Sequence, residues 1–133
     1  LNCRPTRSDA MPTTIITRPI GPTYALSVTS VQTTPIGVPQ KSANPINYAE
    51  FLNTNATSSV CVVVAPLPLP PASPTTPTLV FPVAGAPTIP DSFMLGPAMQ
   101  QPRVVPVPAN GFSVSAIVAA GTSAVFITPV SVM

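Results

Sequence analysis

The chain has 133 residues, of which 45% are hydrophobic, and its five basic and three acidic side chains give a formal net charge of +2. This length suits one domain with its own core, and so many apolar residues with so little charge exclude an intrinsically disordered chain. The 21 prolines exclude a mainly helical fold, because each proline inside a helix costs about 3 kcal/mol. No stretch has the run of apolar residues that a membrane-spanning helix needs.

The sparse charge also bears on partners. A free monomer with so few charges is poorly protected against association. Serine and threonine side chains are one way to keep such a surface polar, and coverage by neighbouring chains is the other. We expect neighbouring chains to cover much of the surface.

Residues 1–22 are predicted to form an extended N-terminal arm. Arg4, Arg7 and Asp9 lie within the first ten residues. Arg18 follows in a segment whose prolines are expected to block regular strand pairing. The arm lacks the apolar core of a signal peptide. A frayed terminus is the alternative, and an arm held against a partner is the interpretation that we prefer.

Strands are predicted from residue 24 onward. Residues 24–31 alternate apolar and polar side chains with a period of two, which is typical of a half-buried strand. Residues 32–47 contain turn-forming residues, and residues 48–53 are predicted to form the next strand. Residues 60–65, with the sequence VCVVVA, are a β-branched run typical of a strand covered on both faces.

The proline-rich residues 66–77 follow this run directly. They are either a linker between domains, a disordered segment or a loop within one fold. The strands before and after them are each too few to form a core alone, so a stiff, extended loop within one sandwich is the prediction. The segment also has the P-x-x-P spacing of ligands for proline-recognition modules, but no basic residue flanks it.

Three short strands are predicted beyond the loop, over residues 78–83, 92–95 and 103–107. Pro82 and Pro106 place two of them at a sheet edge or a strand end.

Asn110 and Gly111 follow, between apolar runs, and this pair is favoured in two-residue hairpins because both positions tolerate positive φ. We therefore predict a hairpin there between the strands over 103–107 and 112–119, followed by a turn at residues 120–123 and a last strand over 124–130.

About eight short strands at regular spacing indicate an all-β fold. The prediction is a single β-sandwich over residues 23–133, with the proline-rich loop at 66–77 inside it and the arm before it. The order of the strands, jelly-roll or immunoglobulin-like, stays open.

The residues that most catalytic and metal sites need are missing or scattered. The chain has no histidine, which removes the commonest general base and the Ser-His-Asp and Cys-His arrangements. Asp9, Glu50 and Asp91 lie in separate segments. Cys3 and Cys61 are too few for a structural zinc site, and we expect free thiols rather than a bridge. The prediction is a protein without enzymatic activity, cofactor, metal or small-molecule substrate.

Nucleic acid and membrane are not predicted as partners either. Five basic residues with two tyrosines and no tryptophan make no surface for stacking bases and binding phosphates. An arm bound to protein or exposed to solvent explains the arginines better.

Three segments carry a resemblance to a known family. They run from Asn53 to Val62, from Pro82 to Gly85, and from Val125 to Pro129, as a strand pair, an apolar turn and a final hairpin. In this pattern, over about residues 48–130, the chain resembles the small β-sandwich decoration, or cement, proteins of tailed bacteriophage heads. The arm and the proline-rich loop are departures from the family pattern.

The resemblance implies a structural virion protein on the capsid surface, with the major capsid protein and neighbouring copies of itself, in a symmetric homo-oligomer, as partners. We place the partner contacts on the arm and the loop. The predicted contact residues are Arg4, Arg7, Arg18, Pro66, Pro68, Pro70 and Pro71. The alternative is a phage tail or spike component, or a β-sandwich adhesion module that binds a host-surface glycan, although few aromatic residues are present to stack on sugars.

Overall fold

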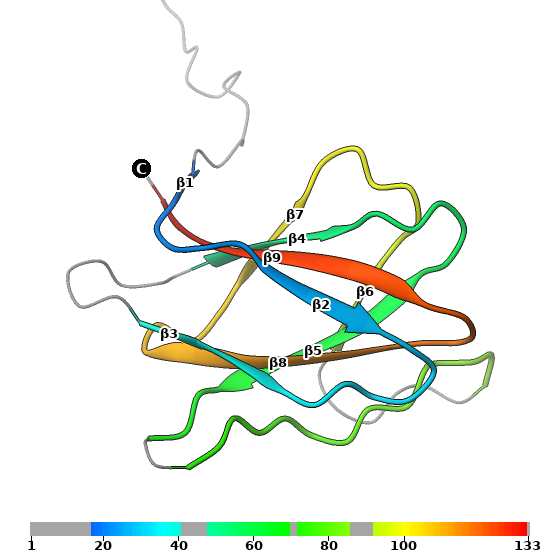
Figure 1. The fold of residues 1–133 in the computed structure, drawn as a ribbon, viewed down its shortest axis with the longest axis horizontal. Coiled ribbons are helices and arrows are strands. Elements are labelled where there is room, and N and C mark those ends of the chain that lie inside the picture. The colour runs from blue at the N-terminus through cyan, green and yellow to red at the C-terminus, as the bar shows by residue number, and fades with distance from the viewer. Residues whose placement is uncertain (1–16, 41–47, 70–71, 86–91, 133) are drawn as a thin grey trace, which may run out of the picture.

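The computed structural model describes residues 17–40, 48–69, 72–85 and 92–132 (Figure 1). The described residues form nine β-strands and no helix. The strands are β1 (Thr17–Pro19), β2 (Tyr24–Val28), β3 (Ile36–Pro39), β4 (Tyr48–Asn53), β5 (Val60–Pro66), β6 (Ser92–Leu95), β7 (Arg103–Pro106), β8 (Gly111–Val118) and β9 (Ser123–Val132). The all-β prediction is therefore confirmed.

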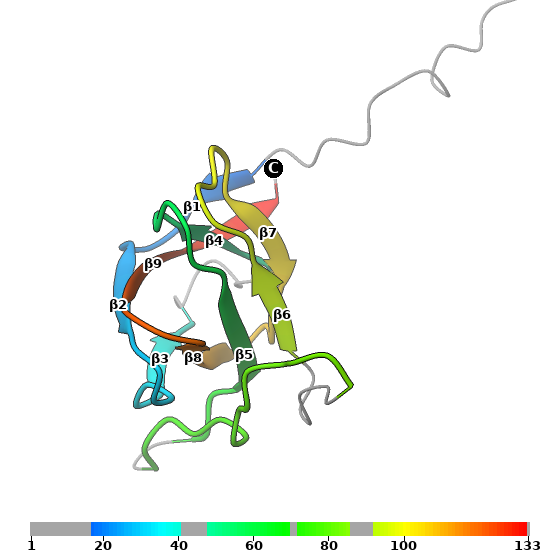
Figure 2. The same ribbon diagram turned by 90° about the vertical axis from the view of Figure 1, so that its right-hand side faces the viewer.

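The strands form two antiparallel sheets, which lie one above the other in Figure 2. In sheet A, β9 pairs on one side with β1 and β2 and on the other with β4, and β7 forms the far edge. In sheet B, the order is β3-β8-β5-β6. The chain is a β-sandwich, as predicted.

The pairing of the strands is nested. β5 pairs with β6, β4 with β7, β3 with β8, and β2 with β9. An immunoglobulin-like sandwich instead pairs its first two strands with each other. Nested pairs that fold over into two four-stranded layers are the jelly-roll arrangement, so the strand order that the sequence left open is that of a jelly roll.

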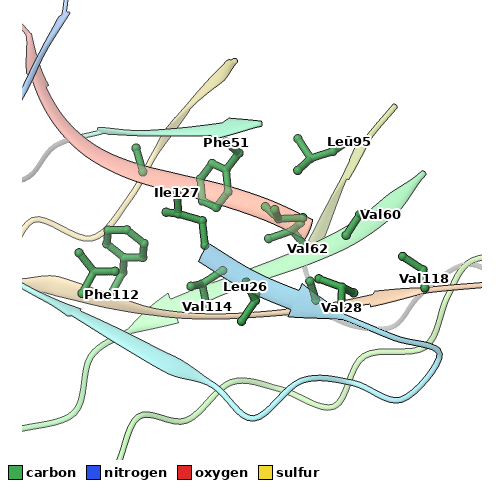
Figure 3. Close-up of a cluster of buried hydrophobic side chains, with 14 residues drawn as sticks. Leu26, Val28, Phe51, Val60, Val62, Leu95, Phe112, Val114, Val118 and Ile127 are labelled. Atoms are coloured by element: carbon green, nitrogen blue, oxygen red, sulfur yellow. The ribbon is translucent and has the colours of Figure 1, made fainter. Parts of the chain in front are cut away.

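The core lies between the sheets and is filled by alternate residues of each strand, because successive side chains of a strand point to opposite faces. On β4, Ala49 and Phe51 are fully buried and the intervening residues are half-buried. The ring of Phe51 packs edge to face on Phe93, with centroids 5.1 Å apart. Figure 3 labels the larger core side chains, which are Leu26, Val28, Phe51, Val60, Val62, Leu95, Phe112, Val114, Val118 and Ile127.

β5 is covered on both faces, as its β-branched run predicted. Val60 and Val62 lie in the core between the sheets. Cys61 and Val63 point to the other face of sheet B and are also buried, in a second cluster with Leu79. Sheet B therefore has a third layer on its outer face.

Asn53, at the end of β4, is a buried polar residue that ties loops together. Its Nδ2 donates to the carbonyl oxygens of Ser58 (2.8 Å) and Gly96 (3.1 Å). Its Oδ1 accepts a hydrogen bond from the backbone N–H of Asn55 at 3.1 Å. Because both ends of the amide are bonded, we assign Asn53 a structural role.

The predicted hairpin at Asn110 and Gly111 is wrong. β7 pairs with β4 and β8 pairs with β3 and β5, so the chain crosses from one sheet to the other at this turn. Of the two turn residues, only Gly111 has a positive φ, of 101°. The glycine is needed because a Cβ there would lie 2.9 Å from the carbonyl oxygen of Val38. The resemblance also implied a final hairpin of β8 and β9. These two strands lie in different sheets and do not pair with each other.

Residues 78–83 are not a strand, contrary to the prediction, although their apolar alternation suggested one. Two strands were also missed. β3 lies within residues expected to form turns, and β1 lies in the predicted arm, where prolines were expected to prevent pairing. Both are short strands at sheet edges, where a proline without an N–H is tolerated. Residues 1–16 of the predicted arm lie outside the described residues.

Candidate interaction surface

The third layer on sheet B is the connection between β5 and β6. We call its described part, residues 66–69 and 72–85, the strap. It runs below β3, β8 and β5 in Figure 1 and across the outer face of sheet B in Figure 2. Three sets of contacts attach it to the sheet.

The first attachment is apolar. Leu79 is 3% exposed and packs in a cluster with Cys61 and Val63 of β5, against which Phe81, Met94 and Ile117 also pack. Cys61 is a free thiol, as predicted. Its burial raises its pKa, and a hydrogen bond from Ser92 opposes that shift. Leu79 therefore covers a patch of sheet B that would otherwise be apolar and open to water.

The second attachment is a polar clamp made by Gln32, in the loop between β2 and β3. Its Nε2 donates to the carbonyl oxygen of Pro77 at 2.9 Å and to Oγ of Ser115 at 2.7 Å. Its Oε1 accepts a hydrogen bond from the backbone N–H of Leu79 at 2.7 Å. The hydroxyl groups of Thr76 and Ser115, which lie 2.7 Å apart, complete the cluster. One side chain thus links the strap to β8.

The third attachment depends on small residues. Gly37 of β3 stands beside Ser113 of β8, and Ser113 stands beside Ala65 of β5, so these three form a row across sheet B. A Cβ at Gly37 would lie 2.8 Å from Leu67 Cδ1 and 3.0 Å from Pro74 Cγ. Because the side chains of this row are absent or small, the strap can lie directly on the sheet.

The strap is uncharged and exposes large apolar side chains beside the exposed polar residues Ser73, Thr75 and Thr78. In the described part of the chain, four large hydrophobic side chains are exposed: Val31 (73%), Leu69 (85%), Val80 (54%) and Val83 (64%). Three of them belong to the strap, and Val31 precedes the clamp residue Gln32. No residue from 51 to 90 carries a charge. Because three of these exposed apolar side chains lie on one uncharged segment, the strap is the candidate interaction surface.

The structure places only some of the predicted contact residues. Arg4, Arg7, Pro70 and Pro71 lie outside the described residues. Pro66 is exposed at the end of β5 and Pro68 is half-buried in the strap. Arg18 is exposed on β1, in sheet A, whereas the strap covers the outer face of sheet B. These two sets of predicted contacts therefore lie on opposite layers of the sandwich (Figure 2).

Other residues of the surface were not predicted. Leu69 and Val83 adjoin prolines, and Val31 and Val80 lie in segments that were predicted to be strands, so the sequence did not mark these four side chains as exposed. The absence of charge between Glu50 and Asp91 was the available signal, because exposed segments normally carry charged side chains.

Within the described ranges, no group of three or more histidine, cysteine, aspartate and glutamate residues is placed to hold a metal ion. No helix in the described part of the chain is long and apolar enough to cross a membrane. Comparison with known protein families, with curated proteins and with solved structures finds no match to the chain.

Proposed function

We propose that this chain is a structural virion protein, a decoration or cement protein that binds the outside of a tailed-bacteriophage capsid through its strap. The observation that supports this proposal most is that the uncharged strap exposes three large apolar side chains, Leu69, Val80 and Val83. Burying such side chains against a shell stabilises the contact by about 25 cal/mol per Å² of apolar surface. The major capsid protein is the partner, and the capsid surface is the location.

The attachment of the strap supports a binding role. Prolines, the Gln32 clamp and the buried Leu79 fix the strap on sheet B before any partner arrives. A surface ordered in advance loses less conformational entropy on binding than a flexible loop. The strap therefore presents its apolar side chains in one arrangement.

A cement protein acts by linkage and needs no catalytic residue. It binds the assembled shell and not the separated subunits, so bound copies shift the equilibrium toward the closed shell. Symmetric copies on a symmetric shell repeat the same contact many times.

The test uses shells assembled from the major capsid protein encoded in the same genome. The chain is mixed with shells, and the bound copies are counted after sedimentation. We expect wild-type chain to bind and to raise the melting temperature of the shell, and the double variant Val80→Asp, Val83→Asp to lose binding. The matched control is the double variant Ala119→Asp, Ala120→Asp, exposed residues of the loop after β8, and it should bind as wild type. Equal binding by both double variants would refute the role of the strap.

A second variant tests the arm. Deleting residues 1–16 leaves β1 in place, whereas deletion to residue 22 would also remove a strand of sheet A. We expect the shorter deletion to weaken binding to shells. A glycan array serves as the comparison with an adhesion module: the proposal expects no bound sugar, and specific binding of a sugar would contradict it.

A further inference from the structure

The edges of the two sheets differ in how they are protected against pairing with another chain. An edge strand has unpaired backbone groups, and proteins commonly protect it with proline, charge or short length. β3 contains Pro39 and follows Pro35. β7 contains Arg103 and Pro106.

β6 is short, and its edge is partly occupied. It has four residues, and the guanidinium of Arg103 donates to the carbonyl oxygen of Met94 at 3.0 Å. The same guanidinium lies over the ring of Phe93, 5.2 Å from its centroid. Arg103 thus closes the side of the sandwich where β6 and β7 lie.

β2 has neither proline nor charge to protect its edge. Its five residues, YALSV, include no proline and no charge, and no residue from 19 to 40 is charged. In the part of the chain that the structure describes, β2 pairs with β9 alone. The hydrogen bond between the hydroxyl groups of Thr23 and Thr128, at 2.8 Å, helps to hold its start against β9. β2 is therefore an ordered, uncharged strand with one side open.

We propose that β2 pairs in antiparallel fashion with β2 of a second copy of this chain, so that sheet A continues across a two-fold dimer. When two identical strands pair in antiparallel orientation about a two-fold axis, each hydrogen bond from the first copy to the second is repeated from the second copy to the first. This makes a second copy a better occupant of the edge than an unrelated peptide.

The side chains of β2 fit a register centred on Leu26. In that register Ala25 faces Ser27 of the second copy, and Tyr24 faces Val28 of the second copy. Ala25 and Ser27 are small and exposed, so no bulky or charged side chain stands in the way. Val28 is fully buried within its own copy, so the pairing depends on backbone hydrogen bonds rather than on a contact between Tyr24 and Val28.

This pairing is distinct from the proposed function. β2 lies at the edge of sheet A, and the strap covers the outer face of sheet B (Figure 2). The dimer forms in solution whether or not the strap binds a shell. Failure of one proposal therefore leaves the other intact.

Sedimentation velocity of the purified full chain tests the dimer. We expect wild type to be dimeric and Ala25→Lys to be monomeric, because the substitution puts a charge on the edge of both copies. Ala119→Lys, which adds the same charge at an exposed loop position, should remain dimeric. A circular dichroism spectrum and a thermal melt check that each variant is folded. A monomeric wild type, or a dimeric and folded Ala25→Lys, would overturn the proposal.

Cross-linking tests the register. In a Cys3→Ser background, the double variant Ala25→Cys, Ser27→Cys places a cysteine opposite a cysteine of the second copy. Oxidation should give a covalent dimer on a non-reducing gel. Ala25→Cys alone or Ser27→Cys alone puts each cysteine opposite a different residue, so each should cross-link at least tenfold more slowly. Equal rates for the single and double variants would overturn the register, and no covalent dimer in any of them would overturn the pairing.

Discussion

The backbone nitrogen of Leu79 and Oε1 of Gln32 lie 2.7 Å apart, although 47 positions separate them in the chain. The contact joins the loop after β2 to the strap. Because Leu79 also covers Cys61, the hydrogen bond holds in place the side chain that closes the outer cluster of sheet B. Gln32 is thus a structural link between the core fold and the candidate interaction surface.

Gln32→Ala should loosen the strap. The substitution removes the clamp and leaves Leu79 N–H and Ser115 Oγ with fewer partners, so the free energy of unfolding should fall by about 1–3 kcal/mol. In a Cys3→Ser background, the rate at which a thiol reagent labels Cys61 should rise. Gln100→Ala, at an exposed position, is the control and should change neither quantity. Unchanged labelling in Gln32→Ala would show that the clamp does not hold the strap.

Ser113 and Ser115 offer a matched pair on the same face of β8. Ser115 Oγ is bonded to Gln32 and Thr76, whereas buried Ser113 Oγ has no hydrogen-bond partner among the described residues. Ser115→Ala should therefore lower the free energy of unfolding by about 1–2 kcal/mol, and Ser113→Ala should leave it unchanged or raise it by up to about 1 kcal/mol. Chemical denaturation measures both. The reverse order of stabilities would contradict this assignment.

Gly37→Ala should push the strap off the sheet. The added methyl group meets Leu67 and Pro74 at distances that require one of them to move, and the proline ring is rigid. We expect a loss of about 1–3 kcal/mol in stability, with faster labelling of Cys61 in the Cys3→Ser background. Gly96→Ala is the control, because a Cβ at Gly96 has nothing within 4 Å. If the two variants behave alike, the close approach of the strap is not what makes Gly37 necessary.

Arg103→Ala should weaken the side of the sandwich at β6 and β7. It removes the hydrogen bond to Met94 and the contact with the ring of Phe93. An exposed cation–π contact contributes about 0.5–1 kcal/mol, so the melting temperature of the variant should be lower than that of wild type. Arg103→Lys keeps the charge but not the planar donor group, so it should fall between wild type and alanine. A lysine variant less stable than the alanine variant would argue against this account.

The thiol of Cys61 makes stability depend on pH in the alkaline range. Burial raises the pKa of this thiol above its ordinary value of 9.0, so the unfolded chain releases the proton at a lower pH than the folded chain. The contribution of the thiol to stability is then fully present below that ordinary value and is lost as the pH rises above it. In the Cys3→Ser background, urea denaturation at increasing pH should show a fall that is smaller in Cys61→Ala. Identical slopes for the two proteins would contradict the buried thiol.

Sequence patterns predicted several strands closely, both where burial alternates, as in β4, and where a β-branched run is covered on both faces, as in β5. The predicted ranges 48–53 and 92–95 are those of β4 and β6, and the β-branched run at 60–65 marked β5. Residues 78–83 resemble a strand in sequence because Leu79 of the strap is buried against sheet B while its neighbours Thr78 and Val80 are exposed. β3 was not predicted because prolines flank it, although an edge strand tolerates proline.

The jelly-roll order and the clamp were not predictable from local patterns. The order depends on pairings between distant strands, and the turn at Asn110 and Gly111 carries a local hairpin signal that the nested topology overrides. Gln32 meets Pro77, Leu79 and Ser115 only after the fold has formed. The proline-rich, uncharged segment did indicate an unusual surface, but only the structure shows which of its side chains point outward.

The position of β9 has a consequence for how the chain is made. β9 lies in the interior of sheet A, between β2 and β4, which precede it by many residues. Until the ribosome has released residues 123–132, neither strand has its main partner, and their apolar side chains stay uncovered. Folding during synthesis therefore waits for this late segment, and non-local pairing of this kind is slow. We expect nascent chains stalled before residue 123 to depend on chaperones to stay in solution.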